Sequence, residues 1–171
     1  TDPAGPDLLP GVYTSTDPLG VELAGAVKNV IAIAAGILDG LQAGYNAKSA
    51  LLARGLAEIA RLGQAMGASV ETFFGIAGAG DLATTCFSPE GRNRSLGEAL
   101  GKGEALDAYL ARTRSVVEGV ATAESIEQLR RDKGVDLPIS NAVYRVLKGE
   151  AEPINTIAEL MSRSLKEERS A

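Results

Sequence analysis

The chain has 171 residues, which is enough for one compact domain with a sizeable core but short for two. Its formal net charge is −5 and it has no basic run with interleaved aromatic residues, which argues against a general nucleic-acid binder. Hydrophobic residues make up 45% of the chain but aromatic residues only 4%, so alanine and leucine must fill the core. This composition favours close-packed helices over a sandwich or barrel.

Two residue types limit the chemistry. The absence of histidine excludes Ser-His-Asp and Cys-His nucleophiles and the usual zinc sites, which leaves Lys, Asp, Glu, Tyr and Cys for proton transfer. The single cysteine, Cys86, excludes an internal disulfide framework.

The longest apolar run is bracketed by Lys28 and Asp39, so it does not reach bilayer-spanning length without a charge. We therefore expect a soluble, cytoplasmic protein without a membrane span.

The N-terminal residues differ in composition from the rest. The first ten are dense in Pro, Gly and Asp, which is typical of a linker or a poorly ordered end. Residues 11–15, GVYTS, have the composition of a short strand, but no later segment offers a convincing partner. We interpret 1–18 as a linker with the remnant of something upstream, and 19–171 as a helical domain.

Residues 20–40 predict one long buried helix with an out-of-place charge. Asp17 before Pro18 is a plausible N-cap followed by a first-turn proline. The only basic residue of the span is Lys28, whose ammonium leaves through small and apolar neighbours. One interpretation is a lysine with a buried stem and its head in water; the other is catalysis. From this helix alone the first outweighs the second. The apolar stripe comprises Ala24, Val27, Val30, Ile31, Ala34 and Leu38.

Further helices follow along the chain. Asn46 is a candidate cap for a helix that stops at Gly67, and Ser69 for a short helix through Phe74. The GIAGAG segment, 75–80, is a weak phosphate-loop candidate because no strand precedes it, so we expect a glycine turn that permits close packing. After the polar turn 88–94, further helices are expected near 94–100, 118–131, 140–148 and 153–165.

Several motifs, in the right order, resemble NAD(P)-dependent glycerol-3-phosphate dehydrogenase. They are GVELAGAVKNVIAIAAGILDGL, NAKSALLARGLAEIARLG, GIAGAGDLATTC, GRNRSLG and VVEG, and the match covers roughly 12–169. What the chain resembles is the second half of that enzyme, a domain similar to the C-terminal domain of 6-phosphogluconate dehydrogenase-like enzymes. The resemblance implies an all-α, multi-helix fold with a short orphan strand near the N-terminus. It also implies that 1–18 includes a remnant of the upstream cofactor domain.

The resemblance implies roles for four residues. The family's catalytic acid/base corresponds to Lys28, which would protonate the carbonyl oxygen of dihydroxyacetone phosphate as hydride arrives. Asp81 would contact substrate, as an acceptor for a hydroxyl or as the group that orients Lys28, with a helix N-cap as the structural alternative. Arg92 and Asn93 would bind the glycerol phosphate, and a planar guanidinium suits that task.

Other positions depart from the family pattern or add to it. Gly91 stands where the family usually has Ser or Thr, so only its backbone N–H is left to donate to the phosphate. The VVEG motif implies cofactor contacts at Val116 and Glu118, to which the family adds Arg92. Asn29 is a plausible secondary group. For the remaining two candidates, Cys86 and Arg94, packing and a solvated face respectively are the better interpretations.

The implied function is reduction of dihydroxyacetone phosphate to sn-glycerol 3-phosphate for phospholipid synthesis. NAD or NADP would be bound mainly by the upstream domain, so the chain alone is expected to be inactive. The expected partners are these small molecules and not nucleic acid, and a homodimer is left open. Two alternatives remain. One is the helical domain of another hydroxy-acid or sugar-acid dehydrogenase, and the other is a non-catalytic helical dimerisation or interaction module.

Overall fold

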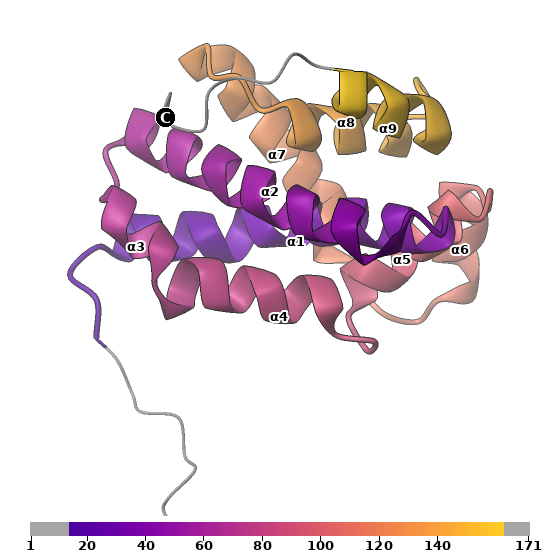
Figure 1. The fold of residues 1–171 in the computed structure, drawn as a ribbon, viewed down its shortest axis with the longest axis horizontal. Coiled ribbons are helices and arrows are strands. Elements are labelled where there is room, and N and C mark those ends of the chain that lie inside the picture. Colours follow the sequence, from indigo (N-terminus) through magenta and orange to yellow (C-terminus); the bar gives the residue numbers. More distant parts are fainter. Residues whose placement is uncertain (1–13, 163–171) are drawn as a thin grey trace, which may run out of the picture.

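The long helix α1 (Pro18–Gly40) runs through the middle of the fold and packs against most of the helices that follow it (Figure 1). It starts as predicted, with Pro18 in the first turn and the Asp17 carboxylate accepting from the Gly20 N–H at 2.9 Å. The same carboxylate accepts from the Ser69 N–H and the Thr72 hydroxyl, at 3.0 and 2.7 Å. The start of α1 is therefore tied to the short helix α3 (Val70–Phe74).

The computed structural model describes residues 14–162, and within that range every regular element is a helix. The all-α prediction is confirmed. The predicted strand at 11–15 falls mostly outside the described residues, and Thr14 and Ser15 are not in a strand. After α1 the elements are α2 (Gly44–Met66), α3 (Val70–Phe74), a π-helical turn (Ile76–Gly80), α4 (Asp81–Phe87), α5 (Arg92–Gly101), α6 (Leu106–Arg112), α7 (Glu118–Lys133), α8 (Pro138–Leu147) and α9 (Pro153–Ser162).

By length and hydropathy, α1 would pass as a membrane span. However, 67% of its most apolar window is buried inside the described fold. Burial against other helices accounts for this apolar surface, as in the core helix of a helical domain. The predicted stripe is buried throughout, and Ile33, Ala35 and Ile37 are buried as well.

Helices α1 and α5 run parallel and touch through their backbones. Asn93 contacts Asn29, and a Cβ on Gly97 or Gly101 would lie 2.0 or 2.5 Å from the carbonyl oxygen of Ile33 or Ile37. Each of these pairs is separated by the same 64 positions as Asn29 and Asn93. The contacts therefore repeat every four residues along both helices. Because no side chain separates the backbones, the two helices are held in one register.

Three details differ from the predictions. Helix α2 begins at Gly44, so Asn46 lies inside its first turn and is not the cap; Gln42 and Gly44 have positive φ (56° and 83°), which lets a tight turn start the helix early. The predicted glycine turn after α3 takes a π-helical form, which the prediction did not specify. Helix α6 was not predicted. The stops at Gly67 and Gly134 are confirmed, both in the left-handed region.

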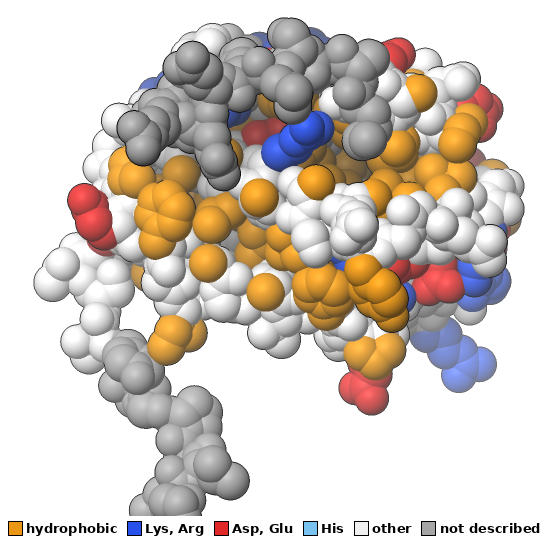
Figure 2. Space-filling model, in the orientation of Figure 1, with side chains coloured by type: hydrophobic (Ala, Val, Ile, Leu, Met, Phe, Trp, Pro, Cys, Tyr) orange, Lys and Arg blue, Asp and Glu red, His pale blue; other side chains and the backbone are white. Residues whose placement is uncertain are grey.

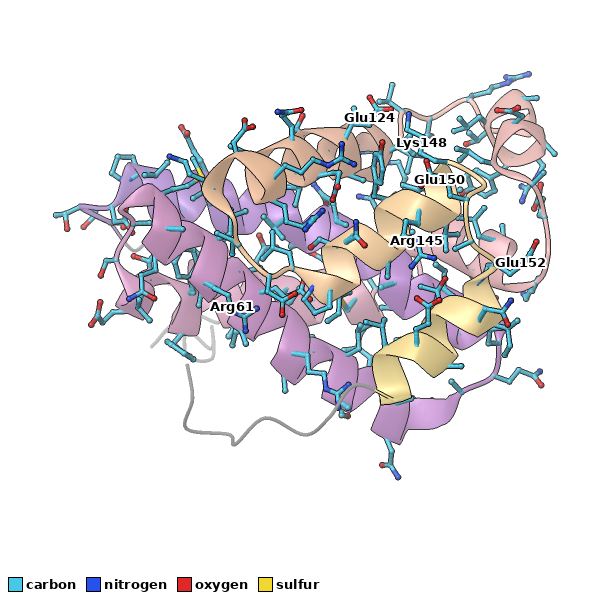
Figure 3. The ribbon with its side chains drawn as sticks, turned by 90° about the horizontal axis from the view of Figure 1, so that it is seen from above. Arg61, Glu124, Arg145, Lys148, Glu150 and Glu152 are labelled. Atoms are coloured by element: carbon cyan, nitrogen blue, oxygen red, sulfur yellow. The ribbon has the colours of Figure 1, made fainter. Side chains whose placement is uncertain are left out.

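Two buried glutamates meet the beginning of α8, which lies between α7 and α9 (Figure 3). Glu58 of α2 accepts hydrogen bonds from the N–H groups of Ile139 and Ser140, and so caps α8 from another helix. Glu127 of α7 accepts from the side-chain amide of Asn141 at 3.1 Å. Carboxylates are favourable at a helix N-terminus because of its positive partial charge.

The face turned to the viewer in Figure 2 carries many apolar and few charged side chains. Large hydrophobic residues that the described fold leaves exposed include Tyr45 on α2, Phe74 on α3 and Phe87 on α4. Contiguous exposed apolar surface is uncommon on a protein that acts alone.

Candidate functional site

Lys28 and Asp81 lie together although they are 53 positions apart. The Lys28 ammonium, in the middle of α1, donates to Oδ2 of Asp81, the first residue of α4, and the two side chains are 22% and 37% exposed. The Thr85 hydroxyl lies 3.3 Å from Oδ1 of the same carboxylate. Asp81 makes no side-chain capping bond, because the cap position of α4 is Gly80, so the N-cap alternative is wrong. The arrangement is an oriented carboxylate holding a partly buried ammonium.

The π-helical turn delivers Asp81 to this position. A Cβ on Gly78 would lie 2.0 Å from the carbonyl oxygen of Phe73, so only glycine permits this close approach. The expectation that these glycines serve packing is supported at Gly78. Single π-helical turns inside helical segments are frequent at functional sites.

Arg92 and Glu118 form an ion pair between two helix starts. Each is the first residue of its helix, α5 or α7, and Arg92 Nη2 lies 2.7 Å from Glu118 Oε1. The side chains are 52% and 46% exposed, and nearby Val116 is 73% exposed. Two helix N-termini and a guanidinium give this surface the polarity that anions prefer.

Asn93 lies inside the protein beneath this pair, only 6% exposed. Its amide nitrogen donates to Asn29 Oδ1 at 2.9 Å, and its amide oxygen accepts from the Gly119 N–H at 2.9 Å. A Cβ on Gly119 would lie 2.6 Å from that oxygen, so a side chain there would displace the Asn93 amide from this position. Sequence reasoning missed Gly119, although it ends the VVEG motif. Asn93 thus joins α1, α5 and α7 directly beside Lys28 and Arg92.

Gly91 is the N-cap residue of α5, and its N–H donates to the Ser88 carbonyl oxygen at 3.3 Å. This N–H is therefore already used within the chain, which leaves the free N–H groups of the first turn of α5 for an anion. The predicted backbone contact from Gly91 to phosphate would compete with the Ser88 bond.

A second charged cluster supports α5 from behind. Asp39 Oδ2 accepts from Arg94 Nε at 2.6 Å and from Lys48 Nζ at 2.7 Å, and Lys48 is only 4% exposed. Arg94 is thus paired and 17% exposed, so its interpretation as part of a solvated face is wrong. Nothing in the sequence indicated that Lys48, in the second turn of the amphipathic helix α2, would be buried. Cys86 is fully buried beside this cluster, and burial raises the pKa of its thiol to about 12, as expected for a packing residue.

The described residues contain no group of three or more Cys, Asp and Glu arranged to hold a metal ion. The site offers instead the Lys28 ammonium as a proton donor, held by the Asp81 carboxylate. It is linked through Asn29 and Asn93 to the Arg92 guanidinium, which lies at two helix N-termini. This set suits proton transfer to a small ligand that carries an anionic group.

Comparison with known proteins gives one consistent family. Residues 17–167 match the family described as NAD-dependent glycerol-3-phosphate dehydrogenase C-terminus. The chain is 54% identical over 159 residues to glycerol-3-phosphate dehydrogenase (NAD(P)+) of Trichlorobacter lovleyi, covering 93% of this chain and 48% of that protein. The counterpart from Geobacter sulfurreducens is 53% identical, with 92% and 47% covered.

Solved structures agree. The glycerol-3-phosphate dehydrogenase of Coxiella burnetii superposes with a TM-score of 0.87 at 39% identity, covering 89% of this chain and 47% of that one. The enzyme of Saccharomyces cerevisiae gives 0.77 at 28% identity, with 86% and 43% covered. The chain spans about half the length of the curated relatives that it matches. Because the match takes in every helix that the structure describes, the chain belongs to the C-terminal domain family of NAD-dependent glycerol-3-phosphate dehydrogenases.

Proposed function

We propose that this chain is the substrate-binding and catalytic-lysine domain of a dehydrogenase that interconverts dihydroxyacetone phosphate and sn-glycerol 3-phosphate with NAD(P)H. The observation that carries the proposal is the Lys28–Asp81 pair, connected through Asn29 and Asn93 to Arg92. Relatives that share about half of its residues carry the name of this enzyme. The product serves glycerophospholipid synthesis.

Lys28 is the proton donor in this proposal. Reduction of the substrate carbonyl builds negative charge on its oxygen, and an adjacent ammonium both stabilises that charge and supplies the proton. Asp81 orients the ammonium through its Oδ2 and is within reach of a substrate hydroxyl. In the reverse direction the neutral amine accepts the proton from the alcohol. Partial burial of the pair limits competition from water.

The substrate phosphate is assigned to the start of α5. Arg92 supplies the charge, and the N–H groups of the first turn, including that of Asn93, supply further donors. The buried side chain of Asn93 fixes the position of this turn against α1 and α7. Gly91, in place of the family's Ser or Thr, removes one hydroxyl contact, so we expect weaker phosphate binding but the same substrate.

The nicotinamide cofactor is assigned to the neighbouring surface of Val116, Glu118 and Arg92. These residues fit such a group, because an exposed apolar side chain stands beside a carboxylate and a guanidinium that are about half exposed. When bound, NAD(P)H supplies the hydride. Most of its binding is assigned to an N-terminal nucleotide-binding domain, joined through 1–18 to the helical domain 19–171.

The proposal extends to the setting of the enzyme. Without the nucleotide-binding domain the hydride donor is not positioned, so this chain alone should not turn over. The exposed apolar residues of α2, α3 and α4 support contact with that domain or with a second subunit in a homodimer. A cytoplasmic location fits the small metabolites involved.

The test is Lys28→Met in the complete enzyme, with Lys102→Met as the matched control on an exposed lysine. Oxidation of NADH and NADPH that depends on dihydroxyacetone phosphate should fall by about 10²-fold or more in Lys28→Met and stay unchanged in the control. Circular dichroism should show both variants folded. Full activity in Lys28→Met would remove the catalytic assignment and favour a non-catalytic helical module.

A further inference from the structure

The guanidinium of Arg92 already has an anionic partner within the chain. Glu118 Oε1 lies 2.7 Å from Nη2, and both residues stand at the first position of their helices. The carboxylate therefore occupies the place where the positive end of α7 and the guanidinium converge, which is also where an external anion would be most favourable.

This ion pair contributes little to the stability of the fold. Both side chains are about half exposed, and such pairs are typically worth a fraction of a kcal/mol. The same helix starts are joined more deeply by the hydrogen bond from the Gly119 N–H to Asn93, which is buried. The Asn93 bond holds the geometry of the two starts whether or not the ion pair is closed.

The atom that Glu118 contacts is the one that a phosphate needs. A guanidinium grips an anion with two parallel N–H bonds, either from Nε and Nη2 or from the two terminal nitrogens, and Nη2 takes part in both. Nη2 has two N–H groups and uses one in each mode, so a carboxylate that accepts from one of them blocks one mode. Its negative charge then lies close to any anion bound in the other mode.

We propose that Glu118 is an internal counter-anion, which pairs with Arg92 when no ligand is bound and gives way to the phosphate of the ligand. This inference rests on the proposed function, which assigns the phosphate to Arg92, and adds that Glu118 limits the affinity for it. Between turnovers the guanidinium stays ordered and neutralised. Release of a phosphorylated product is assisted because the carboxylate re-forms its bond as the product leaves.

The inference predicts that replacing Glu118 tightens phosphate binding, whereas replacing a residue that binds phosphate would weaken it. Glu118→Gln removes the charge but keeps the shape, so inorganic phosphate should bind about threefold to tenfold tighter, the range expected for one unit charge at a half-exposed site. Glu118→Ala should also bind more tightly. If Glu118 instead held Arg92 in position for the ligand, both variants would bind more weakly.

The experiment titrates the ¹⁵N-labelled chain with inorganic phosphate at mildly alkaline pH and follows the backbone amides of Asn93 and Gly119. The matched control is Glu124→Gln, which removes the same charge from the same helix at an exposed residue paired with Lys148 (Figure 3). Its affinity should equal that of the wild type. Tighter binding in both Glu118 variants, with an unchanged control, supports the inference.

Two failures can be told apart. Unchanged or weaker phosphate binding in the Glu118 variants, with Arg92→Gln abolishing it, overturns the counter-anion role and leaves the phosphate assignment in place. Phosphate binding that survives Arg92→Gln, or no binding in the wild type and in both Glu118 variants, overturns the phosphate assignment and the inference together.

Discussion

Replacing Glu58 by glutamine should remove a pH dependence of stability near neutrality. Glu58 is 2% exposed and accepts hydrogen bonds from the Ile139 N–H at 2.5 Å, the Ser140 N–H at 3.1 Å and the Ser140 hydroxyl at 2.9 Å. Burial is the largest influence and raises the pKa of Glu58 from 4.5 to about 7, although these bonds favour the charged form. Glutamine keeps the size and one acceptor oxygen but does not titrate.

The sign follows from proton binding in the two states. The folded chain keeps this proton up to about pH 7, whereas the unfolded chain releases it near 4.5, so the free energy of unfolding falls as pH rises between those values. A tenfold change in proton affinity corresponds to about 1.4 kcal/mol, so a pKa rise from 4.5 to about 7 corresponds to roughly 3 kcal/mol. The wild type should lose that stability by about pH 8 relative to Glu58→Gln.

The assay is urea unfolding followed by far-ultraviolet circular dichroism, from about pH 5 to about pH 8.5. Taking the difference between wild type and variant cancels the titration of groups that do not interact with Glu58. Arg61, whose charge does act on Glu58, stays protonated over this pH range. Glu124→Gln, at a 57% exposed side chain, should run parallel to the wild type. Parallel curves for wild type and Glu58→Gln would refute the reasoning, since the buried carboxyl would then not titrate differently in the folded chain.

Three further changes test other parts of the structure. Gly97→Ala should lower the free energy of unfolding by about 1–3 kcal/mol or more, because its Cβ would lie 2.0 Å from the Ile33 carbonyl oxygen; an unchanged melting temperature would contradict this. Glu127→Gln should abolish a loss of stability that the wild type shows below about pH 4.5. Hydrogen bonds, chiefly from Arg130, lower the pKa of Glu127 to about 2 in the folded chain, so on acidification the unfolded chain binds a proton at this carboxylate first. Urea unfolding at about pH 3 and pH 6 measures the loss, and equal acid sensitivity of wild type and variant would argue against this role of Glu127. Gly91→Ser should raise the free energy of unfolding by a few tenths of a kcal/mol, because the N-cap of α5 has no side-chain hydrogen bond, and should tighten phosphate binding. Weaker binding of inorganic phosphate in a titration of this variant would mean that crowding outweighs the new hydroxyl contact.

Local signals were sufficient for much of the fold. The Asp17–Pro18 start and the glycine stops at Gly67 and Gly134 depend on backbone chemistry within a few residues, so the sequence predicts them. The start of α2 depends instead on positive φ angles at Gln42 and Gly44, and a positive φ is uncommon for glutamine, so residue type alone does not predict this turn. Helix α6 has only seven residues, too few for a periodic signal. The π-helical turn depends on how Gly78 meets the Phe73 backbone, which glycine content does not reveal.

The site residues were predicted, but only one of the two ion pairs was. The resemblance offered Asp81 as a group that orients Lys28, and the two side chains do meet across 53 positions. Nothing in the sequence joins Arg92 to Glu118 across 26 positions. The burial of Glu58 was also missed. A charged residue on the inward side of a helix can be buried only if distant donors satisfy it, and those donors, 81 and 82 positions away, appear only in the folded chain.

The parallel backbone contact between α1 and α5 fixes the backbone positions of Lys28 and Arg92 relative to each other. Lys28 and Arg92 are on these two helices, one residue before the Asn29–Asn93 contact in each. With glycine pressed against carbonyl oxygen, the helices can shift past each other only by a whole turn, about 5.4 Å, which exceeds the length of several carbon–carbon bonds. In the proposed function, the separation between the proton donor Lys28 and the phosphate site at Arg92 is therefore fixed by the helices. Accepting a substrate longer by one carbon would then require changes in the helical turns that carry these two residues, because sliding one helix past the other moves them too far.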